Sequence, residues 1–128
     1  MEIRFAHYGE ERALGASADE IKLFECIRSL LADSGVDPGS VMLVRKSDSY
    51  LTIICRVEIA RIKYTDRAKW ISIQIVDSLR SKYLDSPLFD AQKKKGQLFW
   101  KSSINAIDDI TTEPTYRDVL VAACREGF

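Results

Sequence analysis

Two acids and a lysine in the middle of the chain are the nearest approach to a catalytic site. A metal-dependent nuclease of the restriction type needs such groups to hold a metal ion beside the attacking water, usually as an acid and a later acid-x-lysine tripeptide. Asp48 and Glu58 can lie on neighbouring strands, but alanine stands two positions after Glu58, and Lys63 is five away. We therefore expect Glu58 to pair with Arg56 or Lys69 across a sheet. A divergent nuclease using Glu58 and Lys63 stays an alternative.

The other reactive side chains give little sign of catalysis. His7 is the only histidine, and it lies in an N-terminal segment, residues 1–15, that we expect to be loosely ordered. Cys26, Cys55 and Cys124 are widely spaced and form no CxxC pair, which is typical of buried, reduced thiols. The sequence also has no glycine-rich phosphate loop. We predict no catalytic residues, no metal ligands and no cofactor, and we favour a non-enzymatic function.

The strongest candidate for function is a basic, aromatic segment between residues 61 and 70. Cations interleaved with aromatic rings can track phosphates and stack on the bases of single-stranded nucleic acid. A more ordinary interpretation is a solvated strand face whose rings lie near the core. In a strand, Arg61 and Lys63 point to the same side. The predicted binding residues are Arg61, Lys63, Arg67, Lys69 and Trp70, with Lys93, Lys94 and Lys95 as an extension.

Helices are predicted on both sides of this segment. A helix over residues 17–34 is opened by Ser17 and Glu20 in capping-box spacing, with apolar residues at helical period behind them. Further helices are expected over residues 77–84, in a short turn from residue 86 towards residue 96, after Asn105, and from Pro114 to the residues before position 127.

Strands are predicted where the period changes to two. They cover residues 41–45, 50–56, 57–64, 69–76 and 97–104, with a tight turn or bulge at Arg56 and a hairpin turn at residues 65–68. Ile71, Ile73 and Ile75 share one face, which we expect to meet the helices. Since short turns make consecutive strands antiparallel, the prediction is an α+β fold: an about five-stranded, mainly antiparallel sheet with its helices on one face.

Composition sets the broad class. The chain has 128 residues, 46% of them hydrophobic and 30% charged, which fits one domain over residues 1–128 with a real core. No apolar run approaches the ~20 residues of a membrane span, so we expect a cytoplasmic protein without a membrane partner.

Charge is unevenly distributed although its total is zero. Residues 41–101 hold thirteen basic and six acidic side chains, a balance of +7, whereas the two flanking segments are acidic. We therefore expect a binding domain whose basic sheet engages an acidic macromolecule, either nucleic acid or an acidic protein surface. A homodimer formed through an open sheet edge, or through exposed Trp70 or Trp100, is a further alternative.

Overall fold

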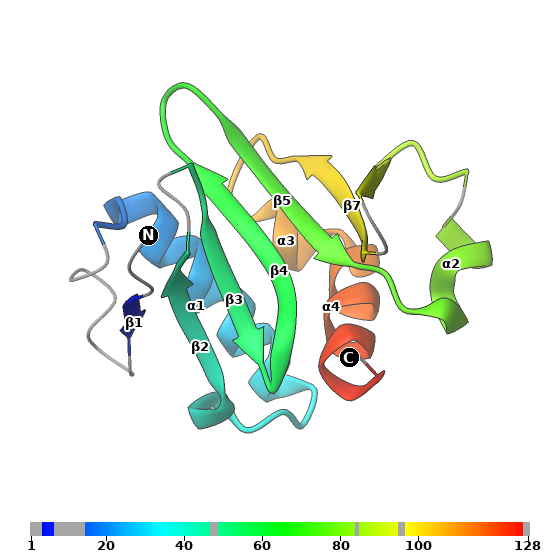
Figure 1. The fold of residues 1–128 in the computed structure, drawn as a ribbon, viewed down its shortest axis with the longest axis horizontal. Helices are drawn as coiled ribbons and strands as arrows, with labels where there is room; N and C mark the ends of the chain where they lie inside the picture. The colour runs from blue at the N-terminus through cyan, green and yellow to red at the C-terminus, as the bar shows by residue number, and fades with distance from the viewer. Residues whose placement is uncertain (1–3, 7–14, 47–48, 84, 95–96, 127–128) are drawn as a thin grey trace.

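A seven-stranded antiparallel sheet is the frame of the molecule, in a computed structural model that describes residues 4–6, 15–46, 49–83, 85–94 and 97–126 (Figure 1). The strand order is β1-β2-β3-β4-β5-β7-β6. The strands are β1 (Arg4–Ala6), β2 (Val41–Arg45), β3 (Leu51–Cys55), β4 (Val57–Tyr64), β5 (Lys69–Gln74), β6 (Asp90–Lys94) and β7 (Gln97–Ser103). The helices are α1 (Ala18–Asp33), the 3-10 turn η2 (Pro38–Ser40), α2 (Asp77–Tyr83), α3 (Asp109–Thr112) and α4 (Pro114–Glu126).

The predicted α+β class and all five predicted strands are confirmed, and two edge strands are added. β1 pairs with β2, and β6 pairs with β7 in antiparallel register. The expectation of a helical turn reaching towards residue 96 was wrong, because residues 90–94 form β6. The segment DAQKK has no strand periodicity of its own, so its backbone adopts the extended form through the ladder with β7.

Helix α1 begins as the capping box predicts. Ser17 Oγ accepts a hydrogen bond from the Glu20 amide at 3.0 Å, and the Glu20 carboxylate accepts one from the Ser17 amide at 3.0 Å. The same two side chains attach the helix to the end of β4, since Ser17 Oγ donates to the Tyr64 carbonyl and the Tyr64 amide donates to Glu20. Asn105, in contrast, does not cap the next-to-last helix. Asp108 precedes α3, and the Asp109 carboxylate accepts from the amides of residues 105 and 106.

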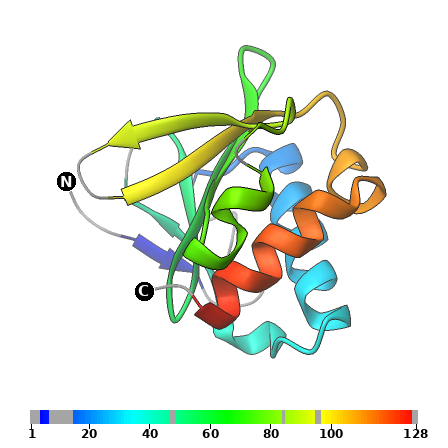
Figure 2. The ribbon, with the colours of Figure 1, turned by 90° about the vertical axis from the view of Figure 1, so that its right-hand side faces the viewer.

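The helices α1, α3 and α4 cover one face of the sheet, as predicted (Figure 2). Ile71 and Ile73 point into this layer and are fully buried with the apolar stripe of α1. One buried polar contact joins the layers: the hydroxyl groups of Ser102 on β7 and Tyr116 on α4 lie 2.6 Å apart. The opposite side of the sheet, which carries Thr52, Arg61, Ser72 and Lys101, is called the outer face below.

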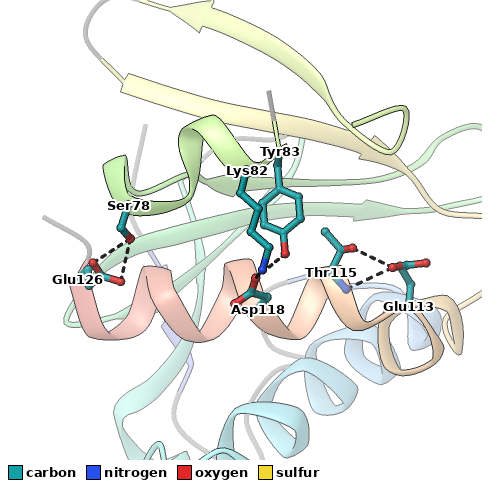
Figure 3. Close-up of polar contacts among 7 residues, drawn as sticks. All are labelled: Ser78, Lys82, Tyr83, Glu113, Thr115, Asp118 and Glu126. Atoms are coloured by element: carbon teal, nitrogen blue, oxygen red, sulfur yellow. Dashed lines mark hydrogen bonds and ion pairs between the residues drawn. The ribbon is translucent and has the colours of Figure 1, made fainter. Parts of the chain in front are cut away.

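Helix α2 lies beside α4 and is attached to it by polar side chains (Figure 3). Lys82 Nζ is 3.0 Å from the Asp118 carboxylate, the Tyr83 hydroxyl donates to the same carboxylate oxygen, and Ser78 donates to Glu126. The hydrogen bond from Tyr83 and the contact with Lys82 lower the pKa of Asp118. No residue of α2 is fully buried, but Leu79 and Tyr83 pack against the core, and the polar contacts add to this attachment.

A single residue forms the turn between β3 and β4, in agreement with the predicted break at Arg56. Arg56 has a φ of 66°, a left-handed conformation that is uncommon for a residue with a side chain. Its guanidinium donates to the Cys124 carbonyl on α4, which holds the turn against the helix. Cys55 and Cys124 are buried and Cys26 is partly buried, all three as free thiols.

Candidate binding surface on the outer face

Arg61 occupies the centre of the outer face. Its guanidinium carbon lies 4.4 Å from the centre of the Phe99 ring and 5.2 Å from the centre of the Tyr50 ring. Its Nε donates to the Glu58 carboxylate at 2.6 Å. Rings and ion pair together fix the side chain, which is about one-fifth exposed (22%).

Trp70 extends this group of rings along β5. The centres of the Tyr50 and Trp70 rings are 6.1 Å apart, and Lys101 Nζ lies 4.8 Å above the Trp70 ring. Lys63 on β4 and Ser103 on β7 are the cross-strand neighbours of Trp70. We call Tyr50, Arg61, Trp70, Phe99 and Lys101 the aromatic–cation cluster.

A bulge in β4 decides which charges meet in this cluster. Ile53 pairs with Ala60 but Ile54 pairs with Glu58, so Ile59 is the extra residue. In a regular strand, residues 58 and 61 would face opposite sides of the sheet. The extra residue resets the alternation, and Glu58 therefore reaches Arg61 on the outer face.

Glu58 has different partners from those expected. Its second oxygen lies 3.2 Å from Lys46 Nζ, so the carboxylate bridges Lys46 and Arg61. Arg56 and Lys69, the expected partners, point elsewhere: Arg56 to α4, and Lys69 to the ring of Tyr64 at 5.2 Å. Asp48 lies outside the described residues. Within them, no group of three or more acidic, cysteine or histidine side chains could hold a metal ion.

The predicted binding residues are brought together only in part. Arg61, Lys63 and Trp70 share the outer face, whereas Lys69 alternates with Trp70 and so points to the other side. Arg67 is exposed in the turn between β4 and β5. Lys93 and Lys94 lie in the edge strand β6, and Lys95 is outside the described residues.

Sequence reasoning missed three members of the cluster: Tyr50, Phe99 and Lys101. Lys101 carried a usable signal, because it alternates with the buried Trp100 and follows the apolar Phe99 by two positions. The expectation of an exposed Trp100 was wrong. Its side chain is 2% exposed and packs under the helices. Of the contacts predicted for a homodimer, those through Trp70 and through an edge strand stay predictions.

No protein-family model, curated protein or solved structure matches this chain. Among the described residues, no helix combines the length and the apolar character needed to cross a membrane.

Proposed function

We propose that the protein is a binding domain whose outer face engages an acidic partner, and that single-stranded nucleic acid is the partner class that fits it best. The observation that supports this most is the aromatic–cation cluster, in which Arg61 and Lys101 lie against three aromatic rings on the face opposite the helices.

The chemistry of the cluster matches both parts of a nucleotide. Aromatic rings stack on bases of any sequence, and each stacked base is worth about 1–3 kcal/mol by alanine substitution. Lys63 is the cross-strand neighbour of Trp70 and Lys101 Nζ lies over its ring, so a base that displaces Lys101 from the ring has two cations close by for its phosphates. An acidic protein surface would use the lysines but has no bases to place on the rings.

The proposal is tested by titrating the protein with a short oligothymidylate and following tryptophan emission. Trp70 is partly exposed and should be quenched by stacking, whereas Trp100 is 2% exposed and should not change. Trp70→Ala should weaken binding about 5- to 150-fold and remove the quenching. Lys63→Gln combined with Lys101→Gln should weaken binding and flatten its salt dependence by about 1.4 in log–log slope.

Lys22→Gln is the matched control, because Lys22 is exposed on α1, away from the outer face. It should leave affinity and quenching close to those of the wild type. If the wild type does not bind oligothymidylate but binds polyglutamate through Lys63 and Lys101, the partner is an acidic protein surface and the nucleic-acid proposal is wrong. Cleavage of the oligonucleotide with magnesium, abolished by Glu58→Ala, would favour the nuclease instead.

A further inference from the structure

A hollow of about 350 Å³ lies at one end of the sheet, between the turn from β4 to β5 and the end of β7. The turn contributes Asp66, Arg67 and Lys69, and the end of β7 contributes Ser103 and Asn105. Arg67 and Lys69, two predicted binding residues that lie outside the aromatic–cation cluster, therefore line this hollow. Its side chains offer two cations, one carboxylate, a hydroxyl and an amide.

Hydrogen bonds fix the backbone around this hollow. Thr65 Oγ1 accepts from the amides of Arg67 and Ala68 at 3.3 Å, and the Thr65 amide donates to the Ala68 carbonyl at 2.9 Å. The Ile104 amide donates to the Lys69 carbonyl at 3.1 Å, which joins the end of β7 to the turn. The two halves of the hollow are thus held by hydrogen bonds rather than by the charges that line it.

The charges of the hollow are available for a ligand. Within the described part of the chain, no ion pair joins Arg67, Asp66 or Lys69 to an opposite charge, and Lys69 Nζ lies 5.2 Å from the centre of the Tyr64 ring. Arginine and lysine donors together with a hydroxyl and an amide are the usual ligands of a phosphate group. Two cations against one carboxylate leave the hollow with a net positive charge.

The hollow adjoins the ring that is proposed to stack on a base. Ser103 lines it and is also the cross-strand neighbour of Trp70. Beside it lies a second hollow of about 280 Å³, which shares Ser103 and Asn105 but adds Asp109 and Glu113. A polyanion leaving the first hollow is repelled by these carboxylates, so its favourable path runs across the outer face.

We propose that the hollow binds one phosphate group of the nucleic acid whose neighbouring base stacks on Trp70. The inference rests on the proposed function and adds a defined phosphate site to it. Arg67 and Lys69 supply the attraction, Ser103 and Asn105 supply hydrogen bonds, and Asp66 limits the affinity by repulsion.

Two variants of opposite charge change test this site. Arg67→Gln combined with Lys69→Gln should weaken oligothymidylate binding and flatten the log–log salt dependence by about 0.7 to 1.4, since one or two cations no longer contact the phosphate. Asp66→Asn should tighten binding about threefold, the effect of removing a like charge some 6 Å away in a water-like dielectric. Lys69→Arg keeps the charge and should keep the affinity.

Matched controls separate a local effect from one of net charge. Lys22→Gln and Glu25→Gln make the same kinds of charge change on the exposed surface of α1 and should shift affinity far less. Circular dichroism shows whether each variant folds. If the wild type binds and Trp70 is quenched, but the variants at Asp66, Arg67 and Lys69 match these controls, the phosphate site is wrong and the proposed function stands. If the wild type does not bind at all, the proposed function fails first.

Discussion

Neutralising Glu58 is the perturbation that best separates the proposed binder from a nuclease. Its carboxylate lies 2.6 Å from Arg61 Nε and 3.2 Å from Lys46 Nζ, so it offsets one of two cations on the outer face. In Glu58→Gln both cations are released towards a polyanion. A nuclease that used this carboxylate would lose its activity, whereas a binder should gain affinity.

The size of the gain follows from the geometry. A carboxylate in contact with Arg61 would lie about 7 Å from a phosphate bound by that guanidinium. At this distance the repulsion between two unit negative charges costs about 0.6 kcal/mol in a water-like dielectric. Removing it should tighten binding about threefold. If Lys46 and Arg61 each become a phosphate contact, the log–log salt dependence should also steepen by up to about 1.4. The side chains of Glu58 and Arg61 are 18% and 22% exposed, so losing the pair should cost roughly 1 kcal/mol of stability.

Fluorescence anisotropy of labelled oligothymidylate at several salt concentrations measures the affinity and its salt dependence, and urea unfolding measures the stability. Glu25→Gln removes an exposed carboxylate on α1, which packs on the face opposite the outer face, and serves as the control. Weaker binding by folded Glu58→Gln, or an unchanged salt dependence, would refute the assignment of Arg61 and Lys46 to a polyanion surface.

Three further outcomes are expected. Tyr116→Phe should lower the free energy of unfolding in urea by about 1–3 kcal/mol, because the buried Ser102 hydroxyl loses its short hydrogen bond to Tyr116, and adding Ser102→Ala should recover part of the loss; purely additive effects would contradict this. Because the pKa of Asp118 is lowered in the folded state, its stabilising contribution is complete above its unfolded pKa and is lost as the pH falls through its folded pKa. The free energy of unfolding should therefore fall less on going from neutral to acid pH in Asp118→Asn than in the wild type. Burial raises the pKa of Cys124, so a thiol reagent should modify Cys124 slowly in the native protein and all three cysteines readily in denaturant; fast native labelling of Cys124 would contradict the burial.

Local signals account for the parts of the fold that the sequence could predict. The capping box at Ser17 and the alternation of Ile71 and Ile73 depend on neighbouring residues alone, so the first helix and the helix-covered face followed from them. β1 and β6 depend on partners distant in the chain or on backbone pairing without a side-chain pattern. No local signal is strong enough to reveal such strands.

Only part of the candidate site could be predicted from the sequence, for the same reason. Arg61, Lys63 and Trp70 follow from alternation along two strands, but the meeting of Arg61 with Phe99 requires knowing that β7 lies next to β5. The pairing of Glu58 with Arg61 requires the bulge at Ile59, which a single sequence does not disclose. Lys69 is different, because alternation with Trp70 already places it on the opposite side.

The position of β7 between β5 and β6 also has a consequence for synthesis of the chain. Until residues 97–103 have emerged, β5 has no neighbour on one side, and until α4 follows, the isoleucines of β5 lack part of their cover. An unpaired hydrophobic edge of this kind is a template for association with other chains. The last quarter of the sequence therefore acts as an internal protector of the sheet, and a nascent or truncated chain ending at residue 94 should be much more prone to aggregate than the whole protein.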